Sequence, residues 1–162
     1  MSMAYNLRFL TEIENGNIAT VQKMVVGGSI NVNQPYLSVF PLNLAIESGN
    51  IDMVAVLLTA SADPLLKFNP KNEKHIKGEV FTAMKLAENM AADPQDKYRM
   101  EAAVMVELMN DPKKLEQRFS AVQVRLGAER DRELQLVKRI LVLSAAALLL
   151  FMGWPYVANL LK

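Results

Sequence analysis

The chain of 162 residues contains no cysteine and a single histidine, His75. Without cysteine there is no disulfide, no thiolate metal site and no cysteine nucleophile. No second ligand stands near His75 at the spacing of a metal site, and no serine lies in the context of a nucleophile elbow. We therefore predict that the protein is not an enzyme and has no catalytic residue, no metal and no cofactor.

Other binding signatures are also missing. Gly27-Gly28 lacks the rest of a phosphate-binding loop, so no nucleotide site is expected. The formal net charge is only +1, and no basic face is large enough to predict a nucleic-acid partner. We expect no small-molecule substrate. Residues 1–16 read neither as a secretory signal nor as a transit peptide rich in arginine and serine.

Charge is absent from one long stretch, residues 140–161, which only Lys162 follows. At about 1.5 Å per residue, a helix of this length measures roughly 33 Å, close to the hydrocarbon core of about 30 Å. We predict a single transmembrane anchor over residues 140–162. The alternative is a buried C-terminal helix of a soluble domain, because Gly153 and Pro155 interrupt the run.

Four residues at the ends of this stretch fit the membrane interfaces. Trp154 and Tyr156 are typical of an aromatic belt, and Lys138 and Arg139 precede the apolar run. Basic residues are concentrated on the same side, where residues 113–139 hold eight Lys and Arg against four Asp and Glu. The positive-inside tendency then places the N-terminal domain on the cytosolic, matrix or stromal side, with the lipid bilayer as a partner.

The N-terminal part contains a repeat with a period of 33 residues. Gly16-Asn17-Ile18 recurs as Gly49-Asn50-Ile51, and each triplet is followed by an apolar stripe in the same register. The stripes fit short helices that cannot bury their apolar faces alone, so pairs of helices must stack. Gly49 permits the positive φ of a tight turn between two such helices.

The segment Phe40–Asn50 and the helix after it resemble the ankyrin repeat, whose pattern runs T-P-L-H-x-A, then G-N, I-V-x-L-L and G-A-D. Ala62-Asp63 matches the closing dipeptide. A degenerate first repeat precedes it from about residue 5, and Phe81–Met90 with Asp96–Asp111 suggest a third. The resemblance covers about residues 5–111. It implies an all-α, ankyrin-like helix-pair stack that serves protein–protein contacts.

The rest of the domain plan follows from this resemblance and the anchor. We expect a repeat domain over 1–111, a basic helical stem over 112–139 and the transmembrane helix over 140–162. In the third repeat, the residues expected to face the core are Met100, Val104, Met105 and Leu108. In the stem, an apolar stripe is expected to pack on the third repeat as a C-terminal cap, or on a partner: Leu115, Phe119, Val122 and Leu126.

In ankyrin-like stacks, the turn tips and the first helices hold partners. The tip after the first repeat presents Tyr36 and Leu37, for which the alternative is a hairpin packed on the next repeat. The enlarged loop after the second repeat would suit an acidic partner or lipid headgroups, its alternative being a solvated loop. Its candidate residues are Phe68, Lys71, Lys74, His75 and Lys77.

Two functions are compatible with this organisation. The first is a non-catalytic structural accessory subunit of a larger membrane protein complex in a mitochondrion or plastid, with protein subunits as partners. The second is a free-standing tail-anchored adaptor that recruits a soluble partner to a membrane. Gly153 and Pro155 favour the first, because a break in a spanning helix is better tolerated against protein than in lipid.

Overall fold

The computed structural model describes residues 3–28, 30–67 and 82–160, with side chains described as far as Ser144. These residues form seven α-helices and no β-strand, so the all-α prediction is confirmed. The chain divides into two compact units, Met1–Val122 and Gln123–Lys162. The helices are α1 (Met3–Glu14), α2 (Ile18–Val26), α3 (Pro41–Glu47), α4 (Ile51–Thr59), α5 (Ala83–Ala92), α6 (Arg99–Asn110) and α7 (Pro112–Leu160).

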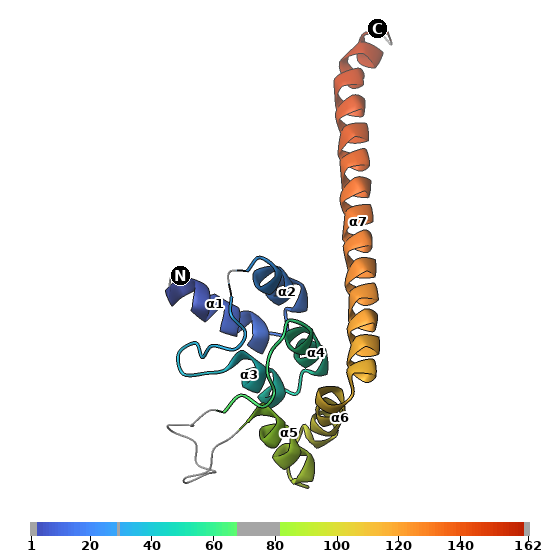
Figure 1. Ribbon diagram of the computed structural model, residues 1–162. Coiled ribbons are helices and arrows are strands. Elements are labelled where there is room, and N and C mark those ends of the chain that lie inside the picture. Colours follow the sequence, from blue (N-terminus) through green and yellow to red (C-terminus); the bar gives the residue numbers. More distant parts are fainter. Residues whose placement is uncertain (1–2, 29, 68–81, 161–162) are drawn as a thin grey trace. The chain divides into compact units, whose positions relative to one another are not determined.

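In the first unit, helices α1 to α6 form consecutive antiparallel pairs, which we call the helix-pair stack (Figure 1). α1, α3 and α5 are neighbours in one layer, and α2, α4 and α6 are neighbours in the other. Because α4 has helices on several sides, it is buried over most of its circumference, from Asp52 to Leu57. The stacking that the apolar stripes require is therefore present in the structure.

In each of the first two pairs, a tight turn with a glycine joins the two helices. Gly16 has φ +71° and Gly49 has φ +68°, so the positive φ predicted for Gly49 is confirmed. A Cβ atom on Gly49 would lie 2.4 Å from Cδ1 of Tyr98, the N-cap residue of α6. A Cβ atom on Gly16 would lie 3.0 Å from Nδ2 of Asn50, the N-cap residue of α4. The second and third pairs thus each place an N-cap residue against the glycine of the pair before it.

The loops that close the pairs are also bonded to one another. Asn33 donates from Nδ2 to the carbonyl oxygen of Ser61 and accepts at Oδ1 from the N–H of Asp63, both at 2.8 Å. Further on, the N–H of Met84 in α5 donates to the carbonyl oxygen of Pro64 at 3.0 Å. Backbone groups of the loops are thereby satisfied, as burial against a neighbouring pair requires.

The orientation of α6 differs from the sequence prediction. Met105 and Leu108 are buried as expected, but Met100 is 75% exposed and Val104 is 38% exposed, so the prediction is wrong for these two. The buried face begins at Ala102, which is fully buried. Met100 and Val104 are each two residues from Ala102, and two residues rotate a helix by about 200°, onto the opposite face.

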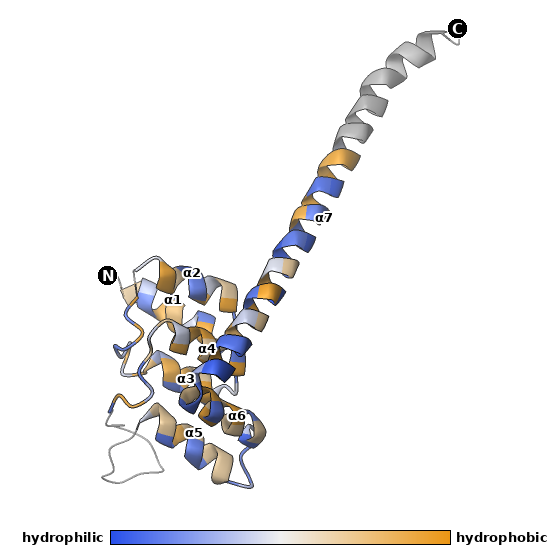
Figure 2. Ribbon diagram, turned by 45° about the vertical axis from the view of Figure 1, so that its right-hand side comes forward, coloured by the Kyte–Doolittle hydropathy of each residue, from blue (hydrophilic) through white to orange (hydrophobic). Residues whose placement is uncertain are grey.

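The longest helix, α7, runs without interruption from Pro112 to Leu160. Figure 2 shows polar and apolar turns alternating along the part of it whose side chains are described. Within the described residues, no helix has an apolar stretch long enough to cross a membrane. The side chains of the predicted anchor beyond Ser144 lie outside the described residues.

Candidate interaction surfaces

A short hairpin connects the first helix pair to the second. Tyr36 and Val39 form an antiparallel bridge in which each N–H donates to the other's carbonyl oxygen at 2.9 Å. Leu37 and Ser38 make the two-residue turn, with φ of +53° and +68°. A turn with positive φ at both central residues favours Asn-Gly, so Leu-Ser holds this backbone at a cost in strain.

The aromatic side chain at this tip is not exposed. Tyr36 is only 7% exposed, and its ring packs edge-on against Phe9 of α1 with centroids 5.9 Å apart. Its hydroxyl accepts from the N–H of Asn31 at 3.0 Å and donates to the carbonyl oxygen of the same residue at 3.1 Å. The prediction of an exposed Tyr36 is therefore wrong. The residue fixes the hairpin on the preceding helix pair, not on the next one.

Leu37, in contrast, is 51% exposed at the tip of the hairpin. The buried Tyr36 beside it and the paired backbone hold this apolar side chain in the solvent. An exposed aliphatic residue on a strained, well-anchored turn fits a contact with another protein, because strained backbone concentrates at functional positions. Leu37 therefore stays a candidate for partner binding.

The other predicted site residues divide into two groups. Lys138 and Arg139 belong to α7 and are exposed. The backbone of Trp154 and Tyr156 is helical, but their side chains lie outside the described residues. The loop candidates also lie outside the described residues: Phe68, Lys71, Lys74, His75 and Lys77.

The start of α7 is fixed by local capping. Asp111 accepts at Oδ1 from the N–H groups of Lys113 and Lys114, at 2.9 and 3.3 Å, and Pro112 occupies the first helical position. Lys114 also donates from Nζ to Oε2 of Glu107 in α6 at 2.8 Å. This hydrogen bond and the charge of Glu107 raise the pKa of Lys114.

One turn later, α7 is joined to α4 by an ion pair. Arg118 donates from Nε to Oδ1 of Asp52 at 2.6 Å. The Asp52 side chain is 12% exposed and the Arg118 side chain 41%. Asp52 stands in the first turn of α4, where the helix dipole also favours a negative charge. The contact joins residues 66 positions apart, and sequence reasoning did not find it.

Next to this ion pair, Phe119 lies over the layer of second helices. It borders a small cleft of about 90 Å³ whose other walls come from α2, α4 and the C-cap of α4: Gln22, Val25, Val26, Val56, Thr59 and Ala60. Val122, one turn further, is fully buried. Of the predicted stripe, Phe119 therefore packs on the stack and Val122 is buried. Phe119 borders the first and second pairs, whereas the sequence analysis expected the stripe on the third pair or on a partner.

Compared with known proteins, the chain matches no family model, no curated protein and no solved structure. Across the described residues, no group of three or more histidine, aspartate or glutamate side chains could hold a metal ion. Leu37 and the cleft beside Phe119 are candidate contact surfaces.

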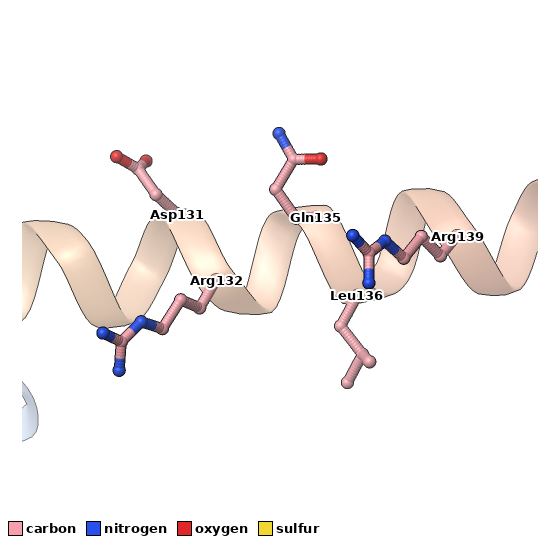
Figure 3. A pocket seen from close by; sticks show the side chains of 5 residues that line it. All are labelled: Asp131, Arg132, Gln135, Leu136 and Arg139. Carbon is pink, nitrogen blue, oxygen red and sulfur yellow. The ribbon is translucent and has the colours of Figure 1, made fainter.

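A third surface lies on α7 in the second unit. Figure 3 shows Asp131 and Gln135 projecting to one side of the helix, and Arg132 and Leu136 to another. Arg139 lies one turn further along the helix, beside Leu136. Leu136 is 60% exposed. Charged and apolar side chains stand together here in solvent.

Proposed function

We propose that this protein is a non-catalytic accessory subunit of a larger membrane protein complex. The helix-pair stack, which resembles ankyrin repeats, makes protein–protein contacts, and the apolar segment over residues 140–162 docks in the bilayer. We place the complex in a mitochondrial or plastid membrane, with the stack on the cytosolic, matrix or stromal side. The second candidate is a tail-anchored adaptor that recruits one soluble protein through Leu37.

The observation that carries the proposal is the continuity of α7. The helix begins beside the stack, where Arg118 bonds to Asp52 and Phe119 packs over α2 and α4. It is helical as far as Leu160, through the uncharged sequence that follows Arg139. The helix therefore joins an interaction domain to a segment of about 20 apolar residues, and this segment has the length that a bilayer requires.

The repeat architecture supports the interaction role. The alternating layers of helices, the positive φ of Gly16 and Gly49 and the bonded loops are the features expected of a stack of short repeats. Such stacks present turn tips on one side, and the tip at Leu37 is exposed. A stack of this kind buries its apolar side chains in the interior and leaves its turn tips available for partners.

The test is purification of the tagged full chain from membranes in a gentle detergent, followed by native electrophoresis and mass spectrometry. A stoichiometric set of integral membrane proteins in one large species is expected. An 18 kDa species or its small oligomers would refute the subunit proposal. A single soluble partner, lost in Leu37→Asp but kept in the matched exposed variant Leu65→Asp, would favour the adaptor instead.

The membrane attachment is tested separately. Deletion of residues 140–162 is expected to release the protein from alkaline-washed membranes, from which the full chain is not extracted. If the full chain is extracted by alkali, or if the truncated chain resists extraction, the apolar segment is not the anchor.

A further inference from the structure

Arginine recurs along α7 at every seventh residue, at positions 118, 125, 132 and 139. Seven residues advance a helix by about 10.5 Å and return nearly to the same face, with a drift of about 20°. Within the second unit, Arg125, Arg132 and Arg139 therefore form one ladder, roughly 21 Å long, on one side of the helix.

A second line of residues runs beside the ladder at alternating spacings of three and four. In the second unit this line, which we call the seam, consists of Leu126, Glu129, Glu133, Leu136 and Ile140. Such spacing keeps side chains facing a partner helix. Leu136 and Ile140 are 60% and 54% exposed, and Arg132 and Arg139 are exposed along one edge of the seam.

Arg118, one heptad before the ladder and in the first unit, shows how an arginine of α7 can pair with a carboxylate. Arg118 bonds to the carboxylate of Asp52, while Phe119, the next residue, lies against apolar side chains of α2 and α4. Arg139 and Ile140 repeat the same order of arginine and apolar residue three heptads later. The planar guanidinium of arginine matches the geometry of a carboxylate, whereas the ammonium of lysine is a point charge without this geometry.

We propose that the seam binds a helix of a neighbouring protein subunit that carries carboxylates seven residues apart. These carboxylates face Arg132 and Arg139, and a basic residue of the same helix faces Glu129 and Glu133. The inference rests on the proposed function, because it identifies the kind of subunit that would lie beside α7.

The charges argue against a second copy of this chain as the occupant. A parallel pair of α7 helices would set Arg125 of one copy against Arg130 of the other. An antiparallel pair would bring the arginine ladders together. Both arrangements place like charges across the seam, which disfavours pairing and leaves an acidic helix as the complementary partner.

The charges also argue against a lipid surface as the occupant. Glu129 and Glu133 stand in the middle of the seam, where anionic headgroups would repel them. The ladder is also far longer than the headgroup region, which adds only about 5–8 Å on each side of the hydrocarbon core. A helix running alongside α7 would reach every arginine of the second unit.

The test uses the full chain in detergent micelles and two synthetic helical peptides. Both peptides carry leucine at seam positions and lysine opposite Glu129 and Glu133. One has glutamate along both edges, and the other has lysine there. Fluorescence anisotropy measures the affinity of each. The acidic peptide is expected to bind at least about tenfold more tightly, because the edge charges attract in one case and repel in the other.

Adjacent residues supply a matched pair of variants. Arg139→Glu and Lys138→Glu change the net charge equally, but Lys138 lies on the face opposite the seam. Arg139→Glu is expected to weaken binding of the acidic peptide about fivefold, and Lys138→Glu is expected to weaken it less than about twofold. In Arg132→Glu/Arg139→Glu the preference is expected to reverse towards the basic peptide. Far-UV circular dichroism checks that helix content is unchanged.

Three results would overturn the inference: equal binding of both peptides, equal effects of the two single variants, or no binding at all. Vesicles of phosphatidylserine that displace the acidic peptide in all variants alike would indicate a lipid surface instead. Co-purification from membranes decides the proposed function independently. If membrane subunits co-purify but the peptides do not bind as expected, the proposed function is kept and the docking surface is rejected. If the peptides bind as expected but no membrane subunit co-purifies, the docking surface is kept and the proposed function is rejected.

Discussion

The glycine turn between α3 and α4 allows the stacking of helix pairs to be tested with a single methyl group. In Gly49→Ala the added Cβ would lie 2.4 Å from Cδ1 and 2.6 Å from Cγ of Tyr98, so the ring or the turn must move. Gly28→Ala is a matched control, because Gly28 has nearly the same backbone, φ +67°, with nothing within 4 Å of its Cβ position. Comparison of the two separates backbone strain from the clash.

The expected magnitudes follow from these two contributions. An L-residue in the left-handed region costs about 1–2 kcal/mol, and both variants share this loss of unfolding free energy. The clash at Gly49 adds about 1–3 kcal/mol, as overpacking does elsewhere. We therefore expect Gly49→Ala to lower the unfolding free energy by about 3 kcal/mol and Gly28→Ala by about 1 kcal/mol. Addition of Tyr98→Ala to Gly49→Ala should cost less than the sum of the two changes.

Urea unfolding of the full chain in purification detergent, followed by far-UV circular dichroism, measures these differences from the midpoints at constant slope. Equal destabilisation by Gly49→Ala and Gly28→Ala would refute the close approach of Tyr98 to the turn. Strict additivity of Gly49→Ala and Tyr98→Ala would refute it as well, because residues in contact are expected to show coupling.

Two further changes test the ends of the stack. Arg118→Ala is expected to lower the unfolding free energy by about 1–3 kcal/mol, because it removes a charge-assisted hydrogen bond to the nearly buried Asp52 carboxylate. The exposed control Arg130→Ala should change it by less than about 0.5 kcal/mol, and equal effects in urea unfolding would contradict the role of the ion pair. Replacement of Leu37-Ser38 by Asn-Gly is expected to raise the unfolding free energy by about 1 kcal/mol, since both residues have positive φ. A lower urea midpoint in this variant would show that the turn is not strained.

The helix pairs were predictable where their signals are local. Apolar spacing and Gly49 were enough to place α3, the turn and α4, because a short helix and its glycine turn depend on residues within a few positions. The same reasoning failed on α6. There the buried face is set by contact with α4 and α5, and the periodicity of an apolar helix with many methionines fits more than one face.

The candidate surfaces depend on contacts between distant residues, and these were only partly predictable. Leu37 was expected at an exposed tip and is exposed. The burial of Tyr36 depends on Phe9, which belongs to a different helix pair. The turn itself gave no signal, since neither leucine nor serine favours positive φ. The pair of Arg118 and Asp52 spans 66 positions and likewise has no local signature.

The hydrogen bond between Met84 and Pro64 has a practical consequence for labelling. It holds together the two ends of the chain that leave the second helix pair and enter the third. An epitope tag or fluorescent protein inserted into the chain between Pro64 and Met84 would therefore leave and rejoin the described fold at neighbouring points. Doubling the length of a closed segment costs only about 0.6 kcal/mol in loop entropy. A label placed there would follow the intact protein while leaving Leu37 and α7 unaltered.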